Sequence, residues 1–418
     1  MRVLLSTIGS RGEVQPLVAL ALELRDLGQE VRLCVPPDFR HWIDGLGFPV
    51  VPIGPELRST ATPGRARPTP DQLRQLAHGT VAAQFATIPV AAAGCDVIVG
   101  AGSLQIAARS IAERMGVPYV HAHFCPITLP SPHHPPPVLG LSGPSGHAPA
   151  REVSNPALWA EDAERWNATW RDALNAHRTS AGQAPVTDVR RHLLTDRPLL
   201  AADATLGPWP SPADLDVVQT GAWIVRERRP LPIELEAFLA DGEPPVYFGF
   251  GSARAPEGLA EAMIRAARAL GRRAIVSRGW TGLSPVDGEP DCLPIGEVDQ
   301  QALFPRVAAA VHHGGAGTTT AAALAGAPQV VVPQMFDQPY WAGRVAALGI
   351  GVAHPQAVPT AGSLTAALEE ALRPGVAARA RAVAAMVTTD GASVVARYVL
   401  SMASTQRLQA QDTAKQPG

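Results

Sequence analysis

This 418-residue chain has no marked excess of basic or acidic residues. Its 35 Lys and Arg residues nearly balance its 37 Asp and Glu residues, which leaves a formal net charge of −2. A nucleic-acid-binding protein needs a clear basic excess to neutralise phosphates, so this balance argues against such a partner. Charged residues make up only 17% of the chain and hydrophobic residues 46%, a composition typical of a folded globular protein.

Cysteines and long apolar runs are also scarce. Cys34, Cys95, Cys125 and Cys292 lie far apart and form no C-x-x-C pair, which fits neither a zinc site nor a disulfide framework. No apolar run approaches the roughly 18 residues of a membrane span, and the apolar start of the chain is too short for a signal peptide. We therefore expect a soluble cytoplasmic protein with no bound metal and no membrane span.

Short apolar runs alternate with amphipathic helical patterns along the chain. Residues 3–8 and 31–35 are apolar runs that flank a Gly-rich turn and a helical pattern with Pro16 in its first turn and Gly28 at its end. Strand, turn, helix and strand in this order make the βαβ unit of a parallel sheet. The same alternation predicts strands at 48–53, 96–100, 117–121, 244–252, 274–279, 308–312 and 329–333, and helices at 38–46, 71–93, 103–115, 257–270, 318–326 and 392–402.

Two irregular Pro-rich stretches, 54–70 and 126–149, interrupt this alternation and are typical of lids, binding loops or disorder. The pattern predicts two doubly wound, Rossmann-like α/β domains, each with a Gly-rich turn at the carboxyl edge of its sheet. We expect the first domain at 1–215, a linker at 216–232, the second domain at 233–385, a terminal helix within 386–403 and a disordered tail at 404–418.

The most informative segment, HHGGAGT at 312–318, lies between a predicted strand and a predicted helix. Its glycines let the backbone approach a ligand, and the helix N-terminus offers free N–H groups that favour an anion. His313 and Thr318 add side-chain donors, so we expect a phosphate site. The alternative is a tight turn with a packed histidine. No G-K-[ST] follows, and neither Gly-rich turn reads G-x-G-x-x-G, which disfavours a Walker A loop and a nicotinamide-cofactor site.

Taken together, these segments resemble the GT-B glycosyltransferases, in particular the bacterial enzymes that glycosylate glycopeptide antibiotics such as vancomycin, with sterol glucosyltransferases as more distant relatives. The resemblance extends over nearly the whole chain, and its most specific parts are HHGGAGTT and PQMFDQPYWAGRVAALGIGVAH. It implies two domains that face each other across a cleft, the first for the acceptor and the second for a nucleotide sugar. It also implies that the terminal helix packs back on the first domain.

The resemblance carries over to individual donor-binding positions. For Trp280 and Val298, ordinary core packing is the alternative. By similarity, His313, Gly315, Gly317 and Thr318 would hold the diphosphate, Asp337 and Gln338 would contact hydroxyls of the sugar, Trp280 and Val298 would border the base, Ser252 would reach the diphosphate, and Ser10 and Arg11 would close on the donor from the first domain.

Glu13 is the candidate catalytic residue, and it departs from the family pattern. The glycopeptide enzymes carry Asp in the S-R-G-D turn, whereas this chain reads S-R-G-E. A carboxylate there can take the proton from an acceptor hydroxyl as the oxygen attacks the anomeric carbon. The alternative is structural, because an acid in the first turn of a helix stabilises the macrodipole.

Two further patterns could suggest a metal, and we interpret neither as a metal site. Asp214 and Asp216 form a D-x-D pair at the edge of the linker, where a solvated surface pair is the simpler interpretation. The spacing of His121, His123, His133 and His134 fits no zinc motif, which leaves acceptor lining or exposure.

These observations predict an inverting, metal-independent hexosyltransferase that forms an O-glycosidic bond. It would transfer a hexose from UDP-glucose or a dTDP-sugar, as co-substrate and without a cofactor, to a hydroxyl of a bulky, partly apolar natural product in antibiotic biosynthesis. We expect a monomer or weak dimer. The alternatives are a sterol or lipid-like acceptor, another GT-B enzyme such as a nucleotide-sugar epimerase, and a nucleotide-binding protein without turnover. The motifs do not choose between UDP and dTDP, or between glucose and a deoxysugar.

Overall fold

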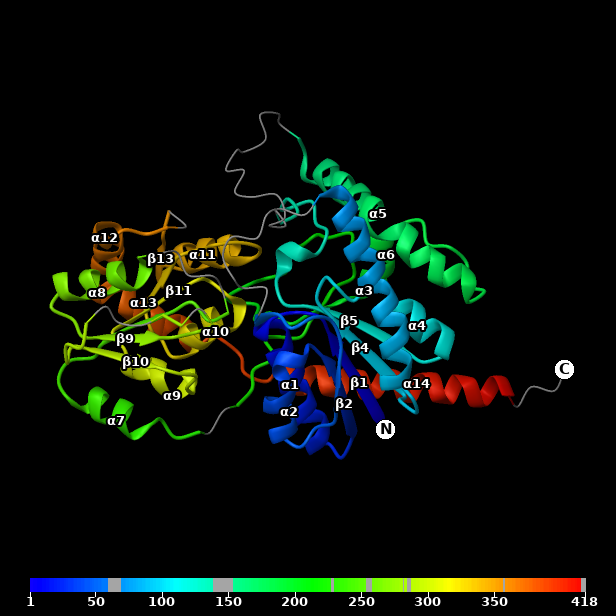
Figure 1. The fold of residues 1–418 in the computed structure, drawn as a ribbon, viewed down its shortest axis with the longest axis horizontal. Coiled ribbons are helices and arrows are strands. Elements are labelled where there is room, and N and C mark those ends of the chain that lie inside the picture. The colour runs from blue at the N-terminus through cyan, green and yellow to red at the C-terminus, as the bar shows by residue number, and fades with distance from the viewer. Residues whose placement is uncertain are drawn as a thin grey trace.

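The computed structural model describes residues 1–58, 69–137, 153–226, 229–252, 258–280, 282–283, 287–355 and 358–414. Within them the chain forms two lobes, each built on one parallel sheet with helices on both faces (Figure 1). The first sheet has the strand order β3-β2-β1-β4-β5-β6-β7, and the second has the order β10-β9-β8-β11-β12-β13. This confirms the predicted class of two doubly wound α/β domains.

The first lobe is organised around β1 and β4, whose side chains are buried on both faces of the sheet. Val3, Leu4 and Leu5 are fully buried, as the central strands of a parallel sheet require. Gly28 takes the left-handed conformation that ends α1, as predicted. The elements are β1 (Arg2–Thr7), α1 (Arg11–Asp26), β2 (Glu30–Val35), α2 (Arg40–Gly45), β3 (Val50–Pro52), α3 (Pro70–Ala91), β4 (Val97–Ala101), α4 (Ala108–Met115), β5 (Tyr119–His123), α5 (Asn155–Ser180), α6 (Val189–Leu194), β6 (Leu199–Leu200) and β7 (Val218–Gln219).

The second lobe repeats this architecture around β8 and β11. Phe248 and Val311 lie in its main apolar cluster with Met263 of α8. The elements are α7 (Ile233–Ala240), β8 (Val246–Gly249), α8 (Leu259–Ala269), β9 (Ala274–Ser277), β10 (Cys292–Ile295), α9 (Gln300–Leu303), β11 (Ala309–His312), α10 (Ala316–Leu324), β12 (Gln329–Val331), α11 (Gln338–Ala347), β13 (Gly351–Ala353), α12 (Ala361–Ala371) and α13 (Pro374–Ala384).

The terminal helix α14 (Gly391–Ala414) returns to the first lobe (Figure 1). Val395 and Val399 are buried in the same cluster as Val14 of α1. The linker crosses the start of this helix so closely that a Cβ on Gly391 would lie 2.5 Å from the carbonyl oxygen of Ala222. Glycine is therefore required where the two crossing segments meet.

Two boundaries differ from those expected. β7 pairs with β6, so the first sheet extends into the range 216–232 expected to be linker. The backbone of α14 continues to Ala414, which makes most of the expected disordered tail helical. Parts of the two irregular stretches, 59–68 and 138–152, lie outside the described residues, as does the end of the tail at 415–418.

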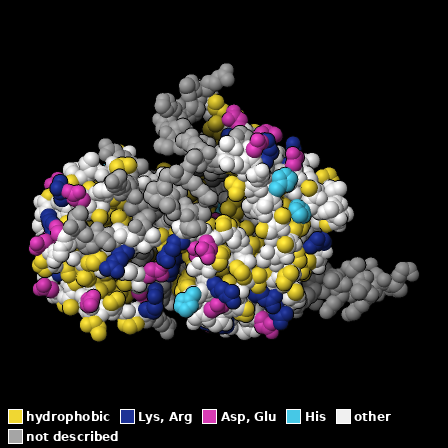
Figure 2. Space-filling view, viewed as in Figure 1, with side chains coloured by type: hydrophobic (Ala, Val, Ile, Leu, Met, Phe, Trp, Pro, Cys, Tyr) yellow, Lys and Arg dark blue, Asp and Glu magenta, His cyan; other side chains and the backbone are white. Residues whose placement is uncertain are grey.

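The surface agrees with the near-neutral composition. Figure 2 shows basic and acidic side chains interspersed over both lobes on the face drawn. Among the described helices, none combines the length and the apolar character needed to cross a membrane.

Candidate functional site

The two lobes meet through loops that follow the carboxyl ends of their strands. Arg11, just after β1, forms an ion pair of 2.5 Å with Glu297, which follows β10. The ring of Trp280, after β9, packs against Phe39 of the first lobe with centroids 6.1 Å apart. The predicted residues Arg11 and Trp280 therefore lie at the junction of the lobes, and both contact the opposite lobe.

Glu13 lies in the first turn of α1, directly behind this junction. Ser10 is the N-cap residue, and its backbone N–H hydrogen-bonds the Glu13 carboxylate, which lowers the pKa slightly. Two larger effects oppose it: burial, followed by the negative charge of Asp337, raises the pKa of Glu13 from 4.5 to about 8. Because Asp337 belongs to the second lobe, this interaction shows that a carboxylate from each lobe lies near the junction.

Asp337 and Gln338 are held in place by contacts within their own loop. Trp341 Nε1 donates to Asp337 Oδ2 at 2.9 Å, and burial raises the pKa of Asp337. The Gln338 Oε1 atom accepts the backbone N–H groups of Gln334 and Met335 at 2.7 and 3.1 Å. Among the described residues, the other carboxylate oxygen of Asp337 and the amino group of Gln338 form no further side-chain hydrogen bond, so both can meet a ligand.

The glycine turn before α10 is fixed by the buried side chain of His312, the first residue of the HHGGAGT segment. His312 Nδ1 accepts the N–H of Gly314 at 3.0 Å, so its Nε2 donates to Gln329 Oε1 at 2.9 Å. Gly314 has φ +88, and a Cβ there would lie 2.7 Å from the side chain of Val331. His312 and Gly314 thus set the direction in which α10 begins.

α10 begins without a side-chain cap, so the free N–H groups of its first turn can bind an anion. The His313 ring lies beside this turn, with Nε2 only 2.6 Å from where a Cβ on Gly315 would be. Burial lowers the pKa of His313 to about 4, against a smaller raising effect of the Gly249 carbonyl. Its Nδ1 atom is buried without a hydrogen-bond partner among the described residues. A ring nitrogen without a partner beside an uncapped helix has the chemistry to donate a hydrogen bond to a phosphate.

The remaining predicted residues lie around this turn. Gly317 and Thr318 belong to the first turn of α10. Ser252 follows Gly251, at which a Cβ would be 3.4 Å from the His313 ring. Val298 packs against an apolar cluster of the second lobe, which agrees with the core-packing alternative for that residue.

The side chains of the patterns that could suggest a metal are engaged in other contacts. Asp216 is exposed and pairs with Arg197 at 3.1 Å. His121 and His123 are buried on β5, with their Nε2 atoms 3.0 Å apart, and His133 bonds the Pro212 carbonyl. In the part of the chain that is described, no group of three or more His, Cys, Asp or Glu side chains could hold a metal ion.

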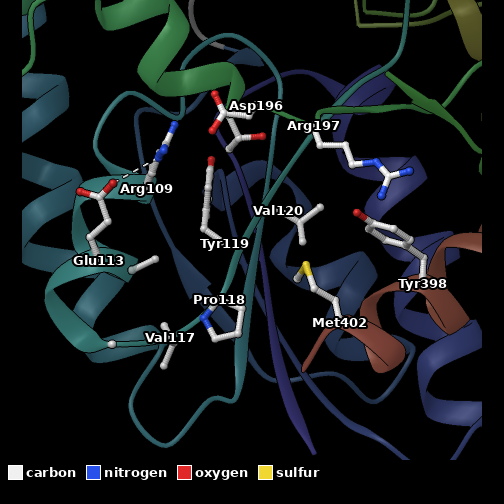
Figure 3. A pocket seen from close by; sticks show the side chains of 13 residues that line it. Arg109, Glu113, Val117, Pro118, Tyr119, Val120, Asp196, Arg197, Tyr398 and Met402 are labelled. Carbon is white, nitrogen blue, oxygen red and sulfur yellow. Dashed lines mark hydrogen bonds and ion pairs between the residues drawn. The ribbon is translucent and has the colours of Figure 1, made fainter. Parts of the chain in front are cut away.

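A cavity of about 450 Å³ opens at the other, amino edge of the first sheet (Figure 3). Tyr119 stands in it, and Tyr398 and Met402 of α14 close one side. Its two guanidinium groups already have partners, Arg109 with Glu113 and Arg197 with Asp216. The cavity therefore has no part in the site at the junction.

Comparisons with known proteins agree with this geometry. Residues 3–131 match the glycosyltransferase family 28 N-terminal domain, and residues 285–396 match the erythromycin biosynthesis protein CIII-like C-terminal domain. The chain is 50% identical over 412 residues to the vancomycin aglycone glucosyltransferase of Amycolatopsis orientalis, covering 97% of this chain and 99% of that enzyme. The chain belongs to this glycosyltransferase family. The predicted resemblance and the predicted sugar-transfer activity are thereby confirmed.

Solved structures of glycosyltransferases have the same two-lobed fold. The kitacinnamycin glycosyltransferase superposes with a TM-score of 0.71 at 20% identity, covering 95% of this chain and 97% of that one. The glycosyltransferase VinC, solved in complex with dTDP, superposes with a TM-score of 0.66 at 20% identity, covering 97% and 100%. These likenesses confirm the predicted GT-B fold.

Proposed function

We propose that this glycosyltransferase moves a hexose from a nucleoside diphosphate sugar to a hydroxyl of a natural-product aglycone, with inversion and without a metal. The observation that carries the proposal is the position of Glu13. Its carboxylate lies at the junction of the lobes, close enough to Asp337 of the second lobe for the two charges to interact. This arrangement supports a base on one lobe and a donor site on the other.

In the proposed reaction, Glu13 takes the proton of the acceptor hydroxyl while that oxygen forms a bond to the anomeric carbon. The bond from the anomeric carbon to the diphosphate oxygen breaks, and the leaving diphosphate keeps the electron pair. A single displacement with one base inverts the anomeric configuration. The N–H groups at the start of α10 and the His313 ring stabilise the charge that develops on the diphosphate, the role a metal plays elsewhere.

The sugar, the diphosphate and the nucleobase of the donor each have proposed contacts. Asp337, through its free oxygen, and Gln338, through its amino group, bind sugar hydroxyls, while Thr318 and the N–H groups of Gly315 and Gly317 bind phosphate oxygens. Further donor contacts are proposed by similarity to the family. Trp280 and Val298 would border the nucleobase, and Ser252, Ser10 and Arg11 would contact the diphosphate.

The proposed acceptor rests on the similarity of the chain to a glycosyltransferase of known acceptor. Since the chain shares half of its residues with a vancomycin aglycone glucosyltransferase, we propose a glycopeptide-like aglycone and UDP-glucose, or a dTDP-sugar, as donor. All four cysteines are free and buried, which supports a reducing cytoplasm. We expect a monomer or weak dimer.

The test is a transfer assay with a glycopeptide aglycone and with UDP-glucose or dTDP-glucose, followed by mass spectrometry and by the anomeric proton coupling of the product. We expect aglycone-dependent consumption of donor and a β-glucoside from the α-linked donor. An α-linked product would overturn inversion. Equal consumption of donor without acceptor would indicate an epimerase or hydrolase instead.

A further inference from the structure

The carboxylate of Glu13 occupies the space of two missing side chains. A Cβ on Gly9 would lie 1.2 Å from Glu13 Oε2 and 2.2 Å from Cδ. A Cβ on Gly102 would lie 2.1 Å from Oε1 and 2.9 Å from Cδ. Atoms cannot approach so closely, so neither position tolerates a side chain while Glu13 keeps this conformation.

These two glycines end neighbouring strands of the first sheet. β1 and β4 pair in parallel with Thr7 beside Ala101, and Gly9 and Gly102 follow these residues at the carboxyl edge. The Thr7 hydroxyl donates to the Ala101 carbonyl at 2.9 Å and lies 3.5 Å from the Gly102 Cβ position. The two strand ends therefore form a niche with one glycine beside each carboxylate oxygen.

We propose that Gly9 and Gly102 are positioning residues that let position 13 carry a glutamate rather than the shorter aspartate. The niche receives the extra methylene of Glu13 by drawing its carboxylate back between the strand ends. The niche also withdraws the carboxylate from water. This inference rests on the proposed role of Glu13 as the base.

Gly9 offers the cleaner test of the two glycines. Its backbone lies outside the left-handed region, so Gly9→Ala adds a methyl group without backbone strain, whereas Gly102 has φ +80. A Cβ on Gly9 would also lie 3.0 Å from the Glu13 Cβ, a contact that a small shift relieves. Gly12→Ala is the matched control, because Gly12 is exposed in the same turn and its Cβ would meet only Ser10 Oγ, at 3.7 Å.

The experiment compares Gly9→Ala, Gly12→Ala, Glu13→Asp and the double variant Gly9→Ala/Glu13→Asp in the transfer assay. The added methyl group should displace the Glu13 carboxylate and weaken its action as a general base. Gly9→Ala should therefore lower kcat by about 10- to 100-fold. UDP affinity should stay within about twofold, because the proposed donor contacts other than Ser10 and Arg11 lie on the other lobe. The rising limb of the kcat–pH profile should move to lower pH as the displaced carboxylate regains water. Gly12→Ala should match the unchanged enzyme.

The double variant decides between positioning and general damage. In the Glu13→Asp background the shorter side chain can turn its carboxylate away from the methyl group. Gly9→Ala should then cost less than about threefold in kcat, a non-additive result typical of residues in contact. An equal loss in both backgrounds, or an unchanged kcat and pH profile in Gly9→Ala, would overturn the proposal. If Gly9→Ala does not fold, a folded double variant supports the niche, and an unfolded one overturns it.

Failure of the base assignment can be told apart from failure of the niche. If Glu13→Gln keeps full turnover, Glu13 is not the base and the proposed function fails in that respect. Melting temperatures then test the niche separately. Gly9→Ala should lower the melting temperature of the Glu13 protein but not that of the Glu13→Asp protein. Equal lowering in both proteins would overturn the niche as well.

Discussion

Glu13 should make the fold less stable as the pH rises. Burial and Asp337 raise the pKa of Glu13 from 4.5 to about 8, so between these values the folded state holds a proton that the unfolded chain has released. The free energy of unfolding therefore falls by about 1.4 kcal/mol for each pH unit in this window, toward a total loss below about 5 kcal/mol. Above pH 8 both states are ionised, and this contribution becomes constant.

Urea unfolding of the unchanged enzyme and of Glu13→Gln between pH 5 and 9 measures this effect. Glutamine does not titrate, so the two proteins should have similar stability near pH 5. As the pH rises, the unchanged enzyme should lose stability and Glu13→Gln should become the more stable of the two. Each kcal/mol corresponds to about 2–4 °C in melting temperature for domains of this size. Glu23→Gln, on the same helix, is the matched control and should keep the slope of the unchanged enzyme. The reasoning is refuted if Glu13→Gln is destabilised equally at every pH, the behaviour of an acid that only stabilises the helix macrodipole.

Three further outcomes follow from the site. His313→Ala should weaken UDP or dTDP binding by about 10- to 100-fold through loss of a hydrogen bond to a charged group, and unchanged affinity by calorimetry would count against the phosphate contact. Asp337→Asn removes the charge that raises the Glu13 pKa, so the rising limb of kcat should move to lower pH; a limb that stays in place would contradict the coupling. Transfer should persist in excess EDTA and in an Asp214→Asn/Asp216→Asn variant, whereas loss on chelation with rescue by Mg²⁺ would bring a metal into the site.

The alternation of strands and helices was predictable from the sequence, because apolar runs and Gly-rich turns indicate it locally. β1, β4, β8 and β11 lie where they were expected, and both Gly-rich turns lie at carboxyl edges. β6 and β7 were not predicted, since each has only two residues and their pairing depends on the finished sheet.

The candidate site was predictable as a set of positions but not as an arrangement. Sequence marks His313 and Glu13 because each belongs to a Gly-rich turn between a strand and a helix. It does not reveal that Asp337 raises the pKa of Glu13, since that coupling needs both lobes in contact. Gly9 and Gly102 look like ordinary turn glycines until the register of β1 and β4 brings them to opposite sides of one carboxylate.

The most direct measurement is the turnover number of Glu13→Gln with saturating donor and aglycone, taken together with its UDP affinity. General-base assistance contributes about 10²–10⁴-fold, so kcat should fall by that factor. UDP affinity should stay within about twofold, because Glu13 is not among the proposed diphosphate contacts. Glutamine keeps the shape of the side chain and removes only the proton acceptor. Turnover retained at the level of the unchanged enzyme would contradict the role of Glu13 as the base.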